Sequence, residues 1–223
     1  MTAGAEALET LARRLLPPGI AVAVLPISAA PAPLLPTEAA CVAKAIPRRQ
    51  HEFALGRTVL RLAIARAGID LPITQPITAR ADRAPDLPRD FGASLSHSRD
   101  YCIALASRNP NLAPGVDVES LTRTAPEGLP RVVQPYRSGA RVDAYDGLLP
   151  FSAKEAIYKS QRPHTGKMLG FGDAAMVILP GRFRARFGCG YWLCGGWGLA
   201  AGHLLTLSWR SGETALPAFR LSD

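Results

Sequence analysis

Two acidic side chains in one short segment have the spacing of a cation site. The segment Gly115-Val116-Asp117-Val118-Glu119 predicts a strand, in which alternate side chains project from the same face. We therefore expect Asp117 and Glu119 to lie together while the two valines face a core. Neighbouring carboxylates repel each other unless a cation lies between them, and Mg²⁺ is a hard ion that prefers oxygen ligands. A solvent-exposed strand edge is the alternative interpretation, because Asp-x-Glu alone is a weak signal.

A third carboxyl group belongs to a predicted helix that begins near residue 151. Ser152 suits the N-cap position, and the alanine, lysine and glutamate that follow it are strong helix formers. Glu155 and Lys159 are four residues apart, so they share a face of this helix, and we expect Lys154 to point elsewhere. The alternative is an ordinary surface helix with a Glu–Lys pair.

The strongest helix pattern, over residues 48–67, carries basic side chains as well as a core stripe. Phe53, Leu60 and Ile64 recur at helical spacing and predict its buried face. Arg49 and Arg57 are eight residues apart, which separates them by about 80° around the helix axis. Both could therefore approach one anionic ligand. A solvated basic face is the alternative interpretation.

The remaining pattern predicts an α+β protein. We expect a helix over residues 5–16, a strand over 20–25, a helix over 37–45, and an antiparallel hairpin over 93–98 and 101–107. A long loop with one short helix at most is expected over 122–150, and strands over 174–179, 183–187 and 204–210. The segment from 188 to 202, rich in Gly, Cys and Trp, gives no assignment.

Composition limits the class of protein and its partners. The 223 residues suffice for one large domain or two small lobes, and the formal charge of +8 suits nucleic acid, a phosphorylated cofactor or an acidic protein. The four cysteines, Cys41, Cys102, Cys189 and Cys194, lack the spacing of a zinc site or a disulfide framework. Neither a signal peptide nor a membrane-spanning run is recognisable, so we expect a cytoplasmic protein without a membrane partner.

In combination, these segments resemble the 4'-phosphopantetheinyl transferases, most closely the two-lobed bacterial branch that serves siderophore, polyketide and non-ribosomal peptide synthesis. The pairing of Gly-Val-Asp-Val-Glu with Lys-Glu-Ala-x-x-x-Lys is the most specific feature. The matching segments follow the family's order: Arg48-Arg49, Glu52-Phe53, Gly56-Arg57, Arg83-Ala84-Pro85, Ser94-Leu95-Ser96-His97-Ser98, Gly115-Val116-Asp117-Val118-Glu119, Phe151-Ser152-Ala153-Lys154-Glu155-Ala156-Ile157-Tyr158-Lys159 and Leu169-Gly170-Phe171. Ala93 departs from the glycine that is usual in the family, and Arg83 replaces a frequent lysine.

The resemblance implies a fold and a reaction. The fold would have two similar lobes related by a pseudo-twofold axis, each with a small antiparallel sheet packed on a long helix. Residues 1–112 would form the lobe that contacts nucleotide phosphates, and residues 113–223 the lobe with the metal and catalytic residues, with the active site in the cleft between them. The reaction would move 4'-phosphopantetheine from coenzyme A to a serine of an acyl, aryl or peptidyl carrier protein. This converts the apo to the holo carrier and releases adenosine 3',5'-bisphosphate.

The resemblance also implies roles for individual residues. Asp117, Glu119 and Glu155 would hold Mg²⁺, and Glu155 and Lys159 would be the catalytic residues. Contacts to coenzyme A would come from Arg49, Arg57, Arg83, Ser96, His97, Lys154 and Lys159.

The expected partners are coenzyme A and an acidic carrier protein, with no nucleic acid, and the expected state is a monomer built as a pseudo-dimer. The basic stretch with Arg123, Arg131, Arg137 and Arg141 would attract the acidic carrier. Two rival functions use the same residues differently: a basic nucleic-acid-binding module and a magnesium-dependent phosphoesterase.

Overall fold

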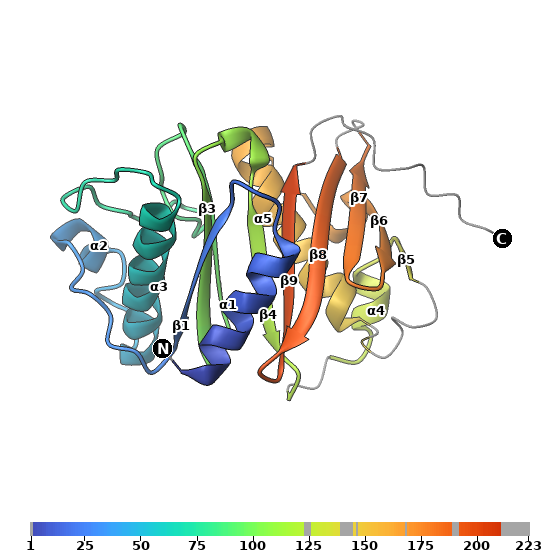
Figure 1. The fold of residues 1–223 in the computed structure, drawn as a ribbon, viewed down its shortest axis with the longest axis horizontal. Coiled ribbons are helices and arrows are strands. Elements are labelled where there is room, and N and C mark those ends of the chain that lie inside the picture. Colours follow the sequence, from blue (N-terminus) through green and yellow to red (C-terminus); the bar gives the residue numbers. More distant parts are fainter. Residues whose placement is uncertain are drawn as a thin grey trace.

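Two sheets of unequal size form the frame of the molecule in the computed structural model, which describes residues 2–122, 126–138, 145, 147–167, 169–188 and 192–210 (Figure 1). The smaller sheet has the strand order β1-β3-β2 and is antiparallel throughout. Its strands are β1 (Ala21–Pro26), β2 (Gly92–His97) and β3 (Tyr101–Ser107). The predicted hairpin over 93–98 and 101–107 and the predicted first strand are thereby confirmed.

The larger sheet has the strand order β4-β9-β8-β7-β6-β5. Its strands are β4 (Gly115–Ser120), β5 (Tyr136–Ser138), β6 (Ala174–Leu179), β7 (Arg182–Phe187), β8 (Trp192–Ala200) and β9 (His203–Arg210). Neighbours run antiparallel except β5 and β6, which pair in parallel. The three strands predicted after residue 170 are confirmed as β6, β7 and β9.

Each sheet packs on one long helix. The helix α3 (Pro47–Arg66) covers the smaller sheet, with Leu55, Val59 and Leu60 fully buried against it. The helix α5 (Leu148–Thr165) packs on β4 and β9 of the larger sheet. The shorter elements are α2 (Pro36–Ala40), α4 (Leu129–Val132), and the 3-10 turns η1 (Pro110–Leu112) and η3 (Phe171–Asp173).

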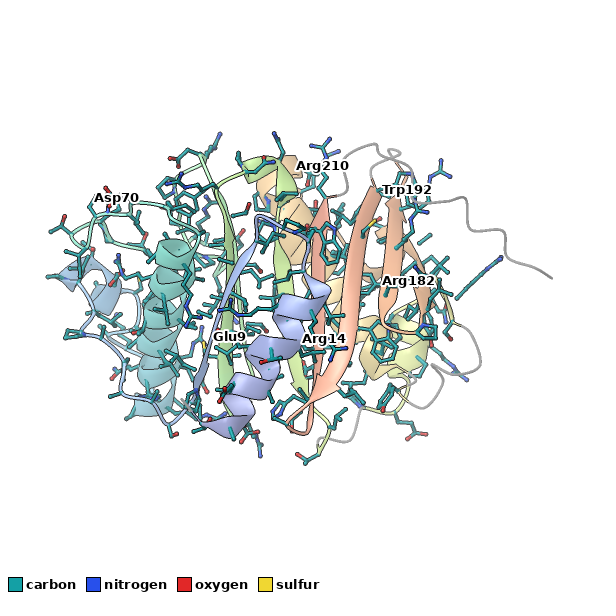
Figure 2. The ribbon with its side chains drawn as sticks, in the orientation of Figure 1. Glu9, Arg14, Asp70, Arg182, Trp192 and Arg210 are labelled. Atoms are coloured by element: carbon teal, nitrogen blue, oxygen red, sulfur yellow. The ribbon has the colours of Figure 1, made fainter. Side chains whose placement is uncertain are left out.

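The first helix, α1 (Ala3–Leu15), joins the two sheets (Figure 1). It contacts β1 of the smaller sheet as well as β8 and β9 of the larger one. Its Leu8 belongs to a buried cluster with Val24, Val116 and Leu205, which come from both sheets. Its Glu9, labelled in Figure 2, accepts hydrogen bonds from Arg66 of α3 and from Arg13. One continuous core therefore crosses the junction between the sheets.

A close approach between β4 and α5 sets the position of the candidate site. A Cβ atom at Gly115 would lie 2.0 Å from the carbonyl oxygen of Ala156, so only glycine lets the strand pass directly beside the helix. Ser208 of β9 donates to the same carbonyl at 2.7 Å, and Ser160 donates to the carbonyl of Ala113. The face of β4 that carries Asp117 consequently lies against α5.

The helix α5 begins earlier than the sequence predicts. It starts at Leu148 with Gly147, at φ +82°, as its N-cap residue. Ser152 is not the N-cap residue: it is buried inside the helix and its hydroxyl contacts Asp117 instead. Among the described residues of the stretch predicted as a loop with one short helix over 122–150, α4 is that short helix, and the sequence does not predict the strand β5.

The unassigned segment from 188 to 202 contains strand β8, and its glycines have a packing reason. A Cβ atom at Gly198 would lie 2.9 Å from Cδ1 of Leu11, and one at Gly196 would lie 3.1 Å from Cβ of Leu15. Both leucines belong to α1, so the strand uses glycine where the helix presses onto the sheet. Cys189 lies outside the described residues.

The α+β class is confirmed, with two sheets that each pack on a long helix. A pseudo-twofold relation between two lobes stays a prediction, and the sheets differ in strand number. The boundary between residues 112 and 113 also stays a prediction, and α1 packs on both sheets. Within the described part of the chain, no helix has the length and apolar character needed to cross a membrane.

Candidate functional site

A buried carboxylate, Asp117, lies where the two sheets meet α5. The residue is only 5% exposed. Its Oδ1 accepts hydrogen bonds from Lys159 Nζ and from Ser96 Oγ, each at 2.9 Å, and its Oδ2 accepts one from Ser152 Oγ at 2.8 Å. The donors come from β2 and α5, while the acceptor is on β4. One side chain thus links two sheets and a helix.

Lys159 is fully engaged by this cluster. Besides Asp117, its ammonium group donates to Ser96 Oγ at 3.1 Å and to the carbonyl oxygen of Val116 at 3.0 Å. An ammonium group has three protons, so these three contacts use all of them. Lys159 can contact a phosphate only by giving up one of these protein partners.

Glu155 lies one helical turn before Lys159, and the charges of Lys159 and Asp117 both affect its pKa. Its side chain is half-buried. Burial is the main reason that the pKa of Glu155 is raised above its ordinary value of 4.5; the positive charge of Lys159 opposes the rise and the negative charge of Asp117 adds to it. A carboxylate with a raised pKa takes up a proton more readily, which suits a general base.

The predicted magnesium site is present as donor groups and not as a formed cluster. No three Asp, Glu, His or Cys side chains of the described residues come together closely enough to hold a metal ion. A carboxylate offers about four acceptor positions; described residues occupy three of those on Asp117 and leave one on Oδ2. Glu119 is half-buried on the same strand. The oxygen donors fit magnesium in kind, and the three-acid site stays a prediction.

Arg49 and His97 form the basic rim beside this cluster. Arg49 Nη1 lies 3.2 Å from His97 Nε2, and its guanidinium group also lies 3.5 Å from Oε2 of Glu52. Loss of solvent around the ring, together with the positive charges of Arg49 and Lys159, holds the pKa of His97 below its ordinary value, although the charge of Glu52 works in the opposite direction. Next to this rim is a cavity of about 470 Å³ lined by Ile27, Arg48, His51, Glu52 and Arg99.

Arg57 is not placed with Arg49 toward one open ligand position, contrary to the expectation from their spacing. It is 4% exposed, and its guanidinium donates to the carbonyl oxygens of Ile77 at 2.5 Å and Thr78 at 3.1 Å. It also lies 4.0 Å from the ring centroid of Phe53, and burial lowers its pKa to about 10. In this arrangement Arg57 secures the loop that follows α3.

Lys154 points away from Glu155 and Lys159, as the sequence predicts, and its contact with coenzyme A stays a prediction. Its side chain is fully buried, and Nζ donates to the carbonyl oxygen of Phe171. Burial lowers the pKa of Lys154 to about 8. The buried ammonium group therefore links α5 to η3, and a contact with coenzyme A would require the side chain to become accessible.

Arg83 is exposed and belongs to a tight turn near α5. Its φ of +68° is unusual for a residue with a side chain, and its N–H donates to the carbonyl oxygen of Arg80 at 2.9 Å. The neighbouring Asp82 forms an ion pair with Arg162 of α5. This link between the turn and α5 has no local sequence signal, because the two residues are far apart in the chain.

A second cavity, of about 250 Å³, opens beside Glu155. Tyr158 OH donates to the carbonyl oxygen of Gly170 at 2.6 Å and closes one side of it. The lining residues include the Leu169-Gly170-Phe171 motif: they are Glu155, Tyr158, Gln161, Arg162, Lys167, Leu169, Gly170 and Phe171. The cavity places space for a ligand directly next to the predicted base.

The raised pKa of Glu155 makes a stability prediction for Glu155→Gln. A group with a raised folded-state pKa contributes stability below its unfolded-state pKa and loses that contribution as the pH rises through the folded-state pKa. We expect Glu155→Gln to unfold at a higher temperature than the original protein at pH 7, and the difference to vanish below about pH 4.5. Thermal unfolding in a chelating buffer measures this. A variant that is less stable at pH 7 would contradict it.

Comparisons with known proteins agree on one family. The profile of the 4'-phosphopantetheinyl transferase N-terminal domain matches residues 37–107. The chain is 34% identical to the 4'-phosphopantetheinyl transferase Svp of Streptomyces mobaraensis over 69% of its own length. It is 33% identical to Npt of Nocardia iowensis over 64%, and 31% identical to PptT of Mycobacterium tuberculosis over 65%. Each alignment covers 65% of the relative, just under two thirds of its length. The chain belongs to the 4'-phosphopantetheinyl transferase superfamily.

Proposed function

We propose that this protein transfers 4'-phosphopantetheine from coenzyme A to a serine of an acyl, aryl or peptidyl carrier protein, with adenosine 3',5'-bisphosphate as the second product. The observation that carries the proposal is the cluster in which Asp117 contacts Lys159 while Glu155, on the same helix face, has a raised pKa. Family membership gives this cluster its reaction. The relatives named above are 4'-phosphopantetheinyl transferases by name.

In this proposal Glu155 takes the proton of the carrier serine, directly or through one water molecule. The serine oxygen then forms a bond to phosphorus of the coenzyme A diphosphate, and the bond to adenosine 3',5'-bisphosphate breaks. Lys159 exchanges one of its protein acceptors for the leaving phosphate and compensates its charge. Magnesium, held by Asp117, Glu119 and Glu155, would neutralise negative charge on the diphosphate.

The phosphates of coenzyme A are assigned to the basic rim. Arg49 and His97 supply donors there, and the exposed Arg83 adds a second guanidinium group from its turn. Arg57, Ser96 and Lys154 are hydrogen-bonded to protein groups, so any contribution from them requires a rearrangement on binding.

The acidic carrier protein is assigned to the exposed arginines of α4 and β5, two elements that precede α5 in the chain. Arg131 belongs to α4, which packs beside α5, and Arg137 belongs to β5. Both are exposed. Arg123 and Arg141, which the sequence analysis groups with them, lie outside the described residues. Exposed charges of this kind act mainly on the rate of association.

One feature favours the rival nucleic-acid function. Trp192, labelled in Figure 2 at the start of β8, is 41% exposed. The guanidinium carbon of Arg184 lies 4.8 Å from its ring centroid. Proteins that bind single-stranded nucleic acids often have basic side chains around exposed aromatic rings. A single tryptophan of this kind is weaker support than the Asp117 cluster and family membership together.

Transfer activity is the direct test of the proposal. With magnesium and coenzyme A, an apo carrier protein should gain the mass of one phosphopantetheine group in intact-protein mass spectrometry. We expect Glu155→Gln to lower kcat by about 10²–10⁴-fold, the usual contribution of a general base. Glu6→Gln on the exposed face of α1 is the control and should keep full activity. Phosphate release without carrier modification would instead support the phosphoesterase, and binding of an oligonucleotide without transfer would support the nucleic-acid module.

The basic rim predicts a preference for the 3'-phosphate of coenzyme A. If His97 contacts that group, His97→Ala should weaken binding of coenzyme A by more than tenfold, because a charge-assisted hydrogen bond contributes about 1.5–3 kcal/mol. Binding of dephospho-coenzyme A should change little. Titration calorimetry with both ligands measures the difference, and Arg14→Ala on the exposed face of α1 is the control (Figure 2). Equal losses for the two ligands would place His97 elsewhere.

The arginines near α5 predict a salt-dependent carrier interaction. Raising the ionic strength should increase KM for the carrier protein more than KM for coenzyme A, since exposed charges are screened by salt. Replacing Arg131 and Arg137 by glutamate should reproduce this increase at low salt. The matched control reverses Arg14 of α1 and Arg182 of β7, which changes the net charge by the same amount (Figure 2). An unchanged carrier KM in the first double variant would exclude a role for this segment.

A further inference from the structure

The hydroxyl groups of Ser152 and Thr206 lie next to Asp117 and have no role in the function proposed above. Thr206 on β9 lies directly opposite Asp117 in the β4–β9 register. Ser152 Oγ of α5 lies 2.8 Å from Asp117 Oδ2 and 2.8 Å from Thr206 Oγ1. Ser152 and Thr206 are both fully buried. A strand, a helix and a second strand therefore meet through three side chains.

The number of protons fixes the direction of these hydrogen bonds. An ionised carboxylate only accepts, so the single hydroxyl proton of Ser152 points to Asp117 Oδ2. The contact between the two hydroxyls then requires Thr206 to donate to Ser152. The other possible acceptor for Thr206, the carbonyl oxygen of Asp117, is 3.5 Å away, at the limit for a hydrogen bond. The resulting chain runs from Thr206 through Ser152 to Asp117.

This chain decides how the carboxylate is oriented. Oδ1 already accepts from Lys159 and Ser96, which fills both of its acceptor positions. Among the described residues, Oδ2 accepts only from Ser152, which leaves one of its acceptor positions open. A serine inside a helix can turn its hydroxyl back to a carbonyl of the preceding turn. The donor bond from Thr206 opposes that turn and keeps Ser152 on the carboxylate.

We propose that Ser152 and Thr206 are positioning residues, which hold the Asp117 carboxylate so that the open acceptor position on Oδ2 serves the reacting centre. The inference rests on the proposed transferase function for the meaning of that centre. Neither residue touches the substrate in this account. Their effect on the reaction passes through the orientation of Asp117.

A second buried hydroxyl in the same strand provides a control for a purely structural role of Thr206. Ser208 is also fully buried, lies two residues further along β9, and donates to the carbonyl oxygen of Ala156 in α5 at 2.7 Å. Thr206 and Ser208 thus both join β9 to α5 through a hydroxyl. Only Thr206 is linked to Asp117, so loss of the two hydroxyls separates orientation of the carboxylate from helix packing.

The experiment compares Thr206→Val, which keeps the shape and removes the hydroxyl, with Thr206→Ser, which keeps the hydroxyl. We expect Thr206→Val to lower kcat about tenfold while KM for coenzyme A changes less than twofold, because Ser152 loses the donor that keeps its hydroxyl on the Asp117 carboxylate. Thr206→Ser should retain most of the activity. Ser208→Ala should lower the unfolding temperature as Thr206→Val does and leave kcat unchanged. Coenzyme A binding by calorimetry should be the same in all three variants.

Crystal structures of Thr206→Val and Ser208→Ala provide a measurement that is independent of turnover. The Asp117 carboxylate should rotate away from Ser152 in Thr206→Val and stay in place in Ser208→Ala. Equal kcat in these two variants, or an unmoved carboxylate in Thr206→Val, would overturn the positioning role. An original protein that transfers nothing, together with a carboxylate that rotates only in Thr206→Val, would overturn the transferase function and retain the positioning role.

Discussion

Burial of the Asp117 charge is the constraint on which the arrangement of the two sheets depends. An ionised carboxylate inside a protein is strongly unfavourable unless charged and neutral donors surround it. Lys159 supplies the compensating charge, and Ser96 and Ser152 supply two neutral donors. These donors belong to β2 and α5. If the strand β4 shifted relative to either element, the buried carboxylate would lose a hydrogen-bond donor. The N–H of Val116, which donates to Ser94 of β2 at 3.1 Å, adds a second link at the same junction.

The same constraint explains why so many small residues line the contact between α5 and the larger sheet. Gly115 lets β4 approach the helix backbone, and Ser208 reaches the carbonyl of Ala156. Large apolar side chains would pack well there, but they would hold the helix too far from β4 for Ser152 and Lys159 to reach the carboxylate. The apolar packing of α5 is carried instead by Leu149 and Ile157, which belong to the core cluster with β6, β7 and β8.

Local periodicity predicts a large part of this site. The alternation in residues 115–119 correctly separates the valines, which are buried in the cluster with α1, from Asp117, which faces α5. The four-residue spacing of Glu155 and Lys159 correctly places them close enough to interact. These inferences succeed because side-chain direction in a regular strand or helix follows from the backbone alone.

Long-range packing decides the features that the sequence does not predict. Basic side chains are expected at the surface, yet Arg57 and Lys154 are buried. Their burial is possible because the carbonyl oxygens of Ile77 and Phe171 accept hydrogen bonds from them. Serine is a preferred N-cap residue, but the hydroxyl of Ser152 donates to the Asp117 carboxylate, which is a stronger acceptor than a backbone group. Strand β8 is hidden by its glycines, which lower strand propensity. These glycines are needed because α1, at the other end of the sequence, packs closely against them.

The contact of α1 with the glycines of β8 has a consequence for the synthesis of the chain. The ribosome makes α1 before the other described elements, whereas β8 and β9 are the last of them. Until they appear, Leu11 and Leu15 have only part of their final apolar surroundings, and exposed apolar surface of this kind favours aggregation and chaperone binding. Contacts between such distant segments also carry a large loop-closure cost, which slows folding. The core that joins the two sheets is therefore completed only late, after nearly all of the described chain has been made.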